Sequence, residues 1–193
     1  MKNEVLFINA CVREGSRTKR LADKLLQLLN KPYEELDLSK IEFTRTDESF
    51  LKERDKLIAE RAFDDPMFDL ARSFSEADEI VIAAPYWDLS FPAVLKEYIE
   101  KVCVNGVTFR YSDKGMPVGL CKARRLFYVT TTGGEHAPDE FGFGYIKALA
   151  QVYYGIPEVR LIKAVGLDIY GADPEAIMSA AERELSSMAG IEL

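Results

Sequence analysis

Cysteine and histidine are scarce in this sequence of 193 residues, and their scarcity excludes several kinds of site. The three cysteines, Cys11, Cys103 and Cys121, are odd in number, widely spaced and without a Cys-x-x-Cys pair. They therefore indicate neither a disulfide framework nor a zinc site, and a reducing cytoplasm is the expected setting. Because His136 is the only histidine, a metal site built from several histidines is excluded, and no metal is expected.

Long apolar runs and excess positive charge are also missing. No run approaches the roughly 20 apolar residues that a membrane-spanning helix needs, and the first residues show neither the apolar core nor the cleavage site of a signal peptide. The 25 Lys and Arg residues are outnumbered by 32 Asp and Glu, which gives a formal net charge of −7. Since nucleic-acid binding needs clustered positive charge, we expect neither a nucleic-acid partner nor a membrane, and an anionic ligand needs a local site.

What the sequence does contain is the pattern of a single α/β domain over residues 1–193, with a length and composition typical of one globular domain. Short apolar runs alternate with amphipathic helical patterns. The predicted strands cover residues 5–8, 33–38, 80–84, 125–132 and 159–165. This alternation predicts a flavodoxin-like three-layer sandwich with a five-stranded parallel sheet in the order 2-1-3-4-5, whose ligands gather where the strands end.

Helices are predicted between these strands and after the last one, from the spacing of apolar residues and from capping residues. Their positions are around Leu21–Leu29, two pieces within 39–78 divided at Asp65-Pro66, then 91–103, 144–154 and 173–188. Residues 107–111 are expected to form a short extended excursion or a hairpin outside the main sheet, because turn residues bracket them.

The loop between the first strand and the first helix is a candidate phosphate site. A helix N-terminus presents free backbone N–H groups and about half a positive charge. Ser16 and Thr18 add hydroxyl groups, and a basic cluster surrounds them, formed by Arg13, Arg17, Lys19 and Arg20. The alternative is ordinary N-capping by Ser16 with solvated charges around it.

The same loop supports a second hypothesis, because Arg17-Thr18 follows Cys11 after five residues. This spacing resembles the phosphate loop of low-molecular-weight tyrosine phosphatases, in which a cysteine thiolate attacks a phosphate held by loop amides and the arginine. Such enzymes also need an Asp, usually followed by Pro, as general acid, and Asp65-Pro66 and Asp173-Pro174 are available. Simple packing at the end of a buried strand also explains Cys11.

Two further loops follow the third and fourth strands, the aromatic Tyr86-Trp87-Asp88-Leu89 and the glycine-rich Thr131-Thr132-Gly133-Gly134. Flavin binding needs an anion site, flat side chains against the ring and backbone amides at its edge. Because all three loops open on one edge of a parallel sheet, their convergence favours a flavin site. Taken singly, the aromatic residues are equally explained as core residues and the glycines as a turn.

Over residues 80–136 the sequence resembles the FMN-dependent NADH-azoreductase and NAD(P)H:quinone reductase family. The resemblance is carried by the strand, loop and helix from Ile80 to Val102, by the segment from Gly106 to Tyr111, and by Thr130 to His136. It implies FMN as the bound cofactor and NADH or NADPH as the co-substrate, in a homodimer whose second subunit completes the active site.

The resemblance also implies roles for individual residues. Ser16, Arg17 and Thr18 would hold the FMN phosphate, with Cys11 where relatives often carry a serine. The ring would lie along Tyr86, Trp87, Asp88 and Leu89, where relatives usually carry Met-Tyr-Asn-Phe, and the pyrimidine edge would face Thr131, Thr132, Gly133 and Gly134. Tyr111 and Tyr153 would border the substrate space.

The implied reaction is a ping-pong transfer of two electrons from NAD(P)H to quinones, azo compounds or similar flat acceptors. Since hydride chemistry belongs to the cofactor, no side chain is an obligate acid or base, and Tyr111 and His136 are the candidates for proton transfer. Two alternatives stay open: a phosphatase-like enzyme that uses Cys11 and Arg17, and a flavodoxin-type electron carrier.

Overall fold

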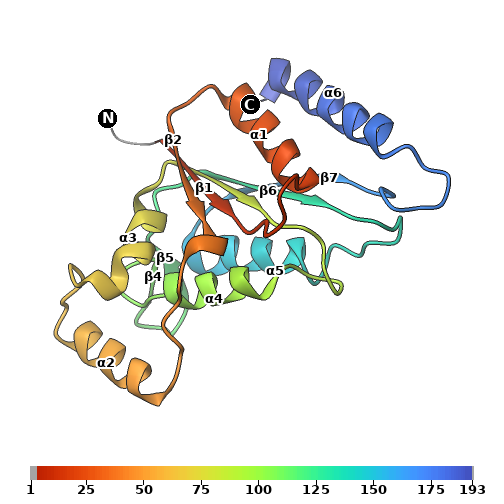
Figure 1. The fold of residues 1–193 in the computed structure, drawn as a ribbon. Coiled ribbons are helices and arrows are strands. Elements are labelled where there is room, and N and C mark those ends of the chain that lie inside the picture. The colour runs from red at the N-terminus through yellow and green to blue at the C-terminus, as the bar shows by residue number, and fades with distance from the viewer. Residues whose placement is uncertain (1–3, 193) are drawn as a thin grey trace.

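A parallel five-stranded sheet organises the structure, a computed structural model that describes residues 4–192. The strands lie in the order β2-β1-β3-β6-β7 (Figure 1). Their bounds are Val5–Asn9 for β1, Tyr33–Asp37 for β2, Glu79–Ala83 for β3, Arg125–Thr131 for β6 and Glu158–Ala164 for β7. Since β6 and β7 are the fourth and fifth strands of this sheet, the predicted flavodoxin-like order 2-1-3-4-5 is confirmed.

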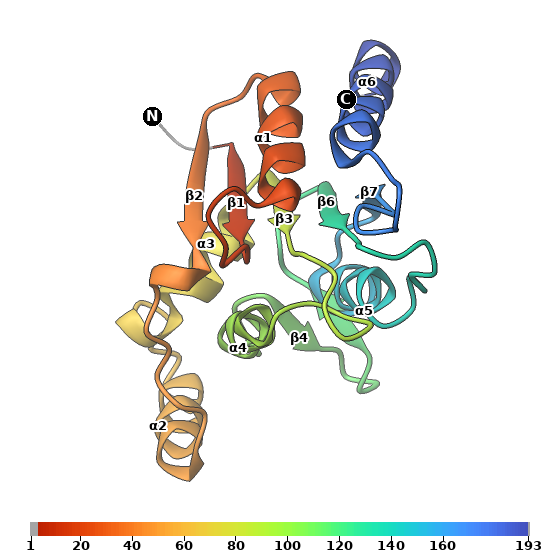
Figure 2. The ribbon, with the colours of Figure 1, turned by 45° about the vertical axis from the view of Figure 1, so that its right-hand side comes forward.

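Helices cover both faces of the sheet (Figure 2). One face packs against α1 (Arg17–Leu29) and α6 (Pro174–Glu192). The other packs against α3, α4, α5 and the π-helix η3, whose bounds are Asp69–Glu76, Ala93–Val102, Phe143–Ala148 and Leu149–Tyr154. Every residue of β1 and β3 is buried, which explains why these strands are apolar except for Asn9 and Glu79 at their ends and do not alternate between apolar and polar residues.

The segment between β2 and β3 extends away from the sheet (Figures 1 and 2). It contains the 3-10 turn η1 (Leu38–Lys40), helix α2 (Glu48–Ala59) and the 3-10 turn η2 (Pro66–Phe68), which leads into α3. The predicted division into two helical pieces at Asp65-Pro66 is confirmed, because Asp65 caps η2 and Pro66 begins it. Of the residues of α2, Leu57 is buried.

A two-stranded hairpin stands apart from the main sheet, as predicted for residues 107–111. Strand β4 (Phe109–Tyr111) pairs antiparallel with β5 (Pro117–Gly119), and the hairpin lies against η3. A Cβ atom on Gly119 would lie 2.2 Å from the backbone nitrogen of Gly155, so only glycine permits this close approach.

Two predicted helices differ in detail from the structure. The helix predicted over 144–154 is an α-helix only to Ala148 and then widens into the π-helix η3, which the pattern of apolar residues does not distinguish from an α-helix. The last helix continues to Glu192, past the predicted end near Met188.

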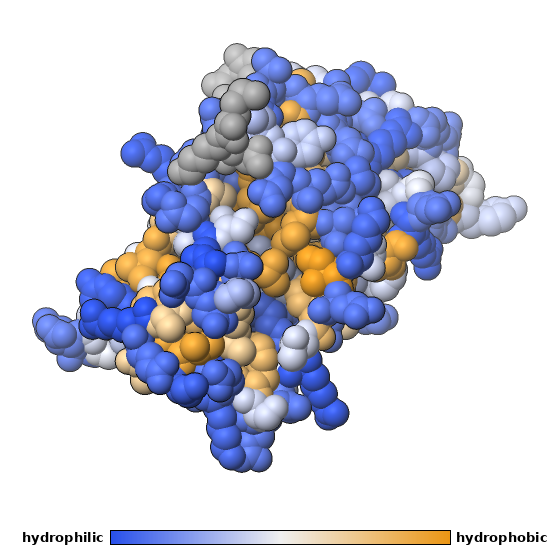
Figure 3. Space-filling model, turned by 60° about the vertical axis from the view of Figure 1, so that its left-hand side comes forward, coloured by the Kyte–Doolittle hydropathy of each residue, from blue (hydrophilic) through white to orange (hydrophobic). Residues whose placement is uncertain are grey.

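The surface agrees with the composition. The face seen in Figure 3 is mostly hydrophilic, and its apolar surface is divided into patches by hydrophilic residues. Within residues 4–192, no helix combines the length and apolar character needed to cross a membrane.

Candidate functional site

A cleft of about 440 Å³ opens where the main strands end, at the switch point between β1 and β3. The loop after β1 supplies residues 12–18, the loop after β3 supplies 85–87, and the loop after β6 supplies 131–133. Asp168, which follows β7, completes the wall. The three loops that the sequence suggested therefore meet in one cleft, whose volume falls in the range of about 300–1,000 Å³ usual for small-molecule sites.

The N-terminus of α1 forms one end of the cleft. Ser16 caps this helix, because its Oγ accepts a hydrogen bond from the backbone N–H of Lys19 at 3.3 Å. The Ser16 side chain also forms a hydrogen bond with Cys11, so a ligand would compete with Cys11 for its hydroxyl proton. Thr18 is 1% exposed, and its hydroxyl shares a hydrogen bond of 2.6 Å with the hydroxyl of Thr131, which ties the start of α1 to the end of β6.

The basic cluster around this helix start is largely neutralised by carboxylates. Its ion pairs join Arg17 to Asp168 at 2.8 Å, Lys19 to Asp23 at 2.8 Å, and Arg20 to both Glu175 and Glu182. Arg13 makes a different contact, with its guanidinium carbon 5.8 Å from the centre of the Trp87 ring. A phosphate in this cleft would therefore depend on helix amides and on particular side chains, since the cluster has little net positive charge.

The aromatic loop is a tight turn. The backbone of Trp87 and Ser90 exchanges two hydrogen bonds, of 3.1 and 2.7 Å. Between them Asp88 and Leu89 have φ of 50° and 66°, the left-handed conformation that both central residues of a type I′ turn require. Aspartate tolerates this conformation well, whereas for leucine it is strained.

This turn divides the four predicted ring contacts into two pairs. Tyr86 and Trp87 line the cleft, whereas Asp88 and Leu89 are exposed at the tip of the turn and are not part of its wall. Tyr86 is fixed at two points, because its N–H donates to the carbonyl of Thr131 at 3.2 Å and its hydroxyl donates to the carbonyl of Pro138 at 3.1 Å. Burial, with Asp139 and Glu140 nearby, raises the pKa of this hydroxyl.

The glycine-rich loop pairs with the loop that follows β7. The backbone N–H of Asp168 donates to the carbonyl of Gly133 at 3.0 Å, and that of Gly166 donates to the carbonyl of Gly134 at 3.1 Å. A Cβ atom on Gly133 would lie 2.5 Å from Oδ2 of Asp168, so glycine makes room for this carboxylate. Gly134 itself is exposed and lies outside the wall of the cleft.

Asp168 is a cleft residue that the sequence reasoning missed, whereas Arg13 was named there only as part of the basic cluster. The signal was present, since Asp168 lies in the loop after the fifth strand, and the carboxyl ends of parallel strands share one edge. Applied to all five strands, the rule that located the other loops would also have selected Asp168.

Cys11 lies beside the cleft and is not part of its wall. Its thiol is buried, with Sγ 3.8 Å from the carbonyl of Ala83, and burial raises its pKa to about 11. A phosphatase nucleophile must instead be a thiolate near neutral pH. The two candidate general acids also have structural roles, because Asp65 caps η2 and Asp173 accepts hydrogen bonds from the first N–H groups of α6.

The residues predicted to contact substrate lie apart from the cleft within one chain. Tyr111 and Tyr153 flank Phe109, with ring centres 5.5 and 4.8 Å from it, and neither lines the cleft. Tyr111 lies in β4, which follows the C-terminal end of α4, and Tyr153 lies in the last turn of η3. Helix α4 alone spans about 15 Å at 1.5 Å per residue. His136 is exposed in the loop after β6, beyond Gly134.

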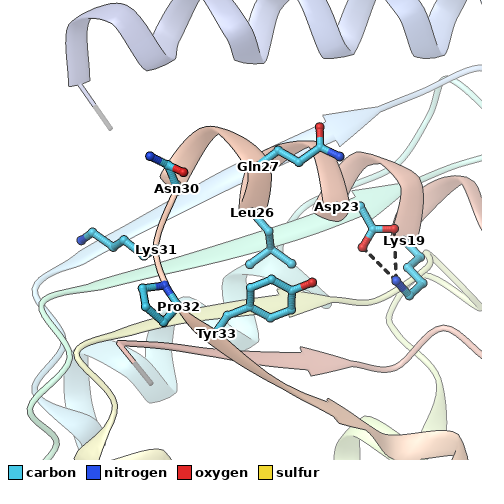
Figure 4. Close-up of a pocket in the computed structure, with 8 residues that line it drawn as sticks. All are labelled: Lys19, Asp23, Leu26, Gln27, Asn30, Lys31, Pro32 and Tyr33. Atoms are coloured by element: carbon cyan, nitrogen blue, oxygen red, sulfur yellow. Dashed lines mark hydrogen bonds and ion pairs between the residues drawn. The ribbon is translucent and has the colours of Figure 1, made fainter. Parts of the chain in front are cut away.

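A larger groove of about 610 Å³ lies between α1 and the start of β2 (Figure 4). Its charged groups are already paired. The ammonium group of Lys19 contacts both carboxylate oxygens of Asp23 at 2.8 and 3.1 Å, and that of Lys31 contacts Glu79 at 3.0 Å. The described residues contain no group of three or more potential metal ligands, here or elsewhere.

Comparisons with known proteins agree with this geometry. A family model described as the flavodoxin-like fold matches residues 3–188. An FMN-dependent NADH:quinone oxidoreductase of Coprothermobacter proteolyticus is 33% identical over 96% of this chain and 98% of its own length. One from Clostridium acetobutylicum is 36% identical over 91% and 92%. The crystal structure of an azoreductase from Bacillus anthracis superposes with a TM-score of 0.81 at 25% identity, covering 97% of this chain and 99% of that one.

Proposed function

Because the chain belongs to the flavodoxin-like family that includes these oxidoreductases, we propose that it is an FMN-dependent NAD(P)H oxidoreductase acting on quinones, azo compounds or similar flat acceptors. The observation that carries the proposal is the meeting of a helix N-terminus, an aromatic loop and a Thr-Thr-Gly loop in one cleft. NADH, the coenzyme in the names of the relatives, is the proposed co-substrate.

The cleft has the groups that FMN needs. Within α1, the N–H groups of Lys19 and Arg20 bond to Ser16, whereas those of Arg17 and Thr18 come earlier and are left for a ligand. Such N–H groups at a helix N-terminus attract a phosphate. Trp87 offers a flat face, and residues 131–133 line the same cleft. FMN binding therefore fits the donors and the aromatic surface that this chain provides.

When bound, the flavin accepts hydride from NAD(P)H and passes two electrons to the acceptor. The protein's own contribution is position. Tyr86 is held by Thr131 and Pro138. The buried hydrogen bond between Thr18 and Thr131 fixes the start of α1, where the phosphate would bind, relative to the end of β6, where the ring would bind. Tyr111 and His136 remain proposed candidates for proton transfer or substrate contact, and no obligate acid or base is proposed.

We also propose a homodimer. The β4–β5 hairpin and the neighbouring η3 expose several apolar side chains, namely Tyr111, Met116, Val118, Leu120 and Val152. A soluble protein usually covers such a patch. A second copy seated on it would explain how Tyr111 and Tyr153, which lie far from the cleft of their own chain, reach the cleft of a partner. We further propose that residues 1–193 form one domain that works in the cytoplasm.

An ultraviolet–visible spectrum with and without added FMN tests the cofactor, and oxidation of NADH in the presence of a quinone or an azo dye tests the reaction. A flavodoxin-type carrier would bind FMN but oxidise little NADH at steady state. A colourless protein that does not bind added FMN and hydrolyses an aryl phosphate would refute the proposal. The buried thiol of Cys11 argues against that outcome. Sedimentation velocity tests the dimer, and a monomer at micromolar concentration would contradict it.

A further inference from the structure

We propose that Asp168 competes with the phosphate of FMN for Arg17, so that cofactor loading exchanges one ion-pair partner of this arginine for another. The proposal rests on the proposed FMN binding and goes beyond it, because it gives Asp168 a role in the affinity for the cofactor. Asp168 and Arg17 both line the cleft, and their ion pair of 2.8 Å joins the loop after β7 to the first turn of α1.

The position of Asp168 is fixed by its backbone and by a glycine opposite. Its N–H donates to the carbonyl of Gly133, and the absence of a side chain on Gly133 leaves the space that its Oδ2 occupies. Arg17 is held as well, since its Nη1 donates to the carbonyl of Leu167 at 3.2 Å. The pair is therefore built into the cleft wall.

The pair is also exposed enough to open. The side chains of Arg17 and Asp168 are 37% and 64% exposed, and ion pairs of this kind are weak because water competes for both partners. A phosphate has a larger charge than a carboxylate and accepts paired hydrogen bonds from a guanidinium. Phosphate bound at the start of α1 would therefore draw Arg17 away from Asp168.

The remaining carboxylate then opposes binding in two ways. It occupies the arginine before the cofactor arrives, and it leaves a negative charge near the phosphate afterwards. Removal of that charge should strengthen FMN binding. If Asp168 instead supported the ribityl chain or the ring, its removal should weaken binding.

The test compares FMN with riboflavin, which lacks the phosphate, on the apoprotein. Dissociation constants are measured from the emission of Trp87, the only tryptophan and a residue of the cleft. For Asp168→Asn we expect FMN to bind about two- to fivefold more tightly, the change that corresponds to one exposed ion pair. The affinity for riboflavin should be unchanged.

Two further variants complete the design. Glu14→Gln is the matched control, because Glu14 lines the same cleft and makes no ion pair within the described residues, so its effect measures charge removal alone. Arg17→Met should weaken FMN binding more strongly in the Asp168→Asn protein than in the wild type, since the competitor is then absent. Asp168→Ser provides a second removal of the carboxylate, and circular dichroism confirms that each variant is folded.

The inference is overturned if Asp168→Asn and Asp168→Ser bind FMN with unchanged or lower affinity. It is equally overturned if riboflavin binding changes as much as FMN binding, or if Glu14→Gln gives the same gain. A wild-type protein that binds neither flavin would refute the proposed function itself and the inference with it, whereas binding of FMN without a gain in the variants refutes only the inference.

Discussion

Replacement of Thr18 by valine should destabilise the protein, although valine has nearly the same shape. The hydroxyls of Thr18 and Thr131 are buried and bond to each other at 2.6 Å, so Thr18→Val leaves the Thr131 hydroxyl without a partner. An unsatisfied buried polar group costs about 1–3 kcal/mol. For a chain of this size, each kcal/mol lowers the melting temperature by about 2–4 °C. Thr131→Val should have a similar cost, for the same reason.

The double variant is the decisive control. When both hydroxyls are replaced, neither is left unpaired, so Thr18→Val with Thr131→Val should be close to the wild type in stability. Urea unfolding of the apoprotein, followed by circular dichroism, gives the three free-energy changes. If the double variant loses as much stability as the two single variants together, the hydroxyl pair is not the link between α1 and β6 and the reasoning is wrong.

Three further predictions follow from buried contacts. Cys11→Ala should oxidise NADH with a quinone as fast as the wild type, because a buried thiol whose pKa is raised to about 11 is not a nucleophile at neutral pH. A folded variant that no longer oxidises NADH would contradict this prediction. Gly119→Ala should separate the hairpin from η3, because the added Cβ would lie 2.2 Å from the backbone nitrogen of Gly155, and sedimentation should then show a weaker proposed dimer. Gly134→Ala is the control and should have no such effect, since its Cβ would have no atom within 4 Å. Burial raises the pKa of Glu79, but hydrogen bonds and ion pairs with Arg125 and Lys31 outweigh burial and leave the pKa below its usual value. The ionised carboxylate therefore stabilises the fold fully above about pH 4.3, and this stabilisation is lost as the pH falls. Glu79→Gln should therefore cost about 1.5–3 kcal/mol at pH 7, measured by urea unfolding, because the Lys31 and Arg125 left behind are partly exposed to water. The cost should be smaller in acid, and an equal cost at pH 7 and pH 3 would contradict the assignment.

The fold was predictable because it depends on regularities that are local in the sequence. Five apolar runs separated by amphipathic helices have few ways to bury both faces of a parallel sheet, and the observed order is one of them. The capping residues at Ser16 and Asp65 likewise act within a few residues of their own position. The π-helical form of residues 149–154 and the true end of the last helix were not predicted, because the pattern of apolar residues neither distinguishes a π-helix from an α-helix nor marks where a helix ends.

The candidate site was predictable in outline for the same reason. Loops that follow parallel strands must emerge at one edge, so the meeting of Ser16, Trp87 and Gly133 could be inferred without knowledge of any distance. Which residues of each loop face the cleft was not predictable. The turn that exposes Asp88 and Leu89 depends on two consecutive positive φ angles, which these residue types do not demand.

The sequence by itself determined the sheet, its order and the edge at which a ligand would bind, since these depend on periodicity and chain connectivity. Only the tertiary structure decided how the charges of that edge are shared. Arg17 and Asp168 are far apart in the chain, as are Thr18 and Thr131, yet each pair is in direct contact. Such pairings arise when loops from different strands pack together, and ion pairs and hydrogen bonds act only over a few ångströms, so no pattern of neighbours along the chain records them.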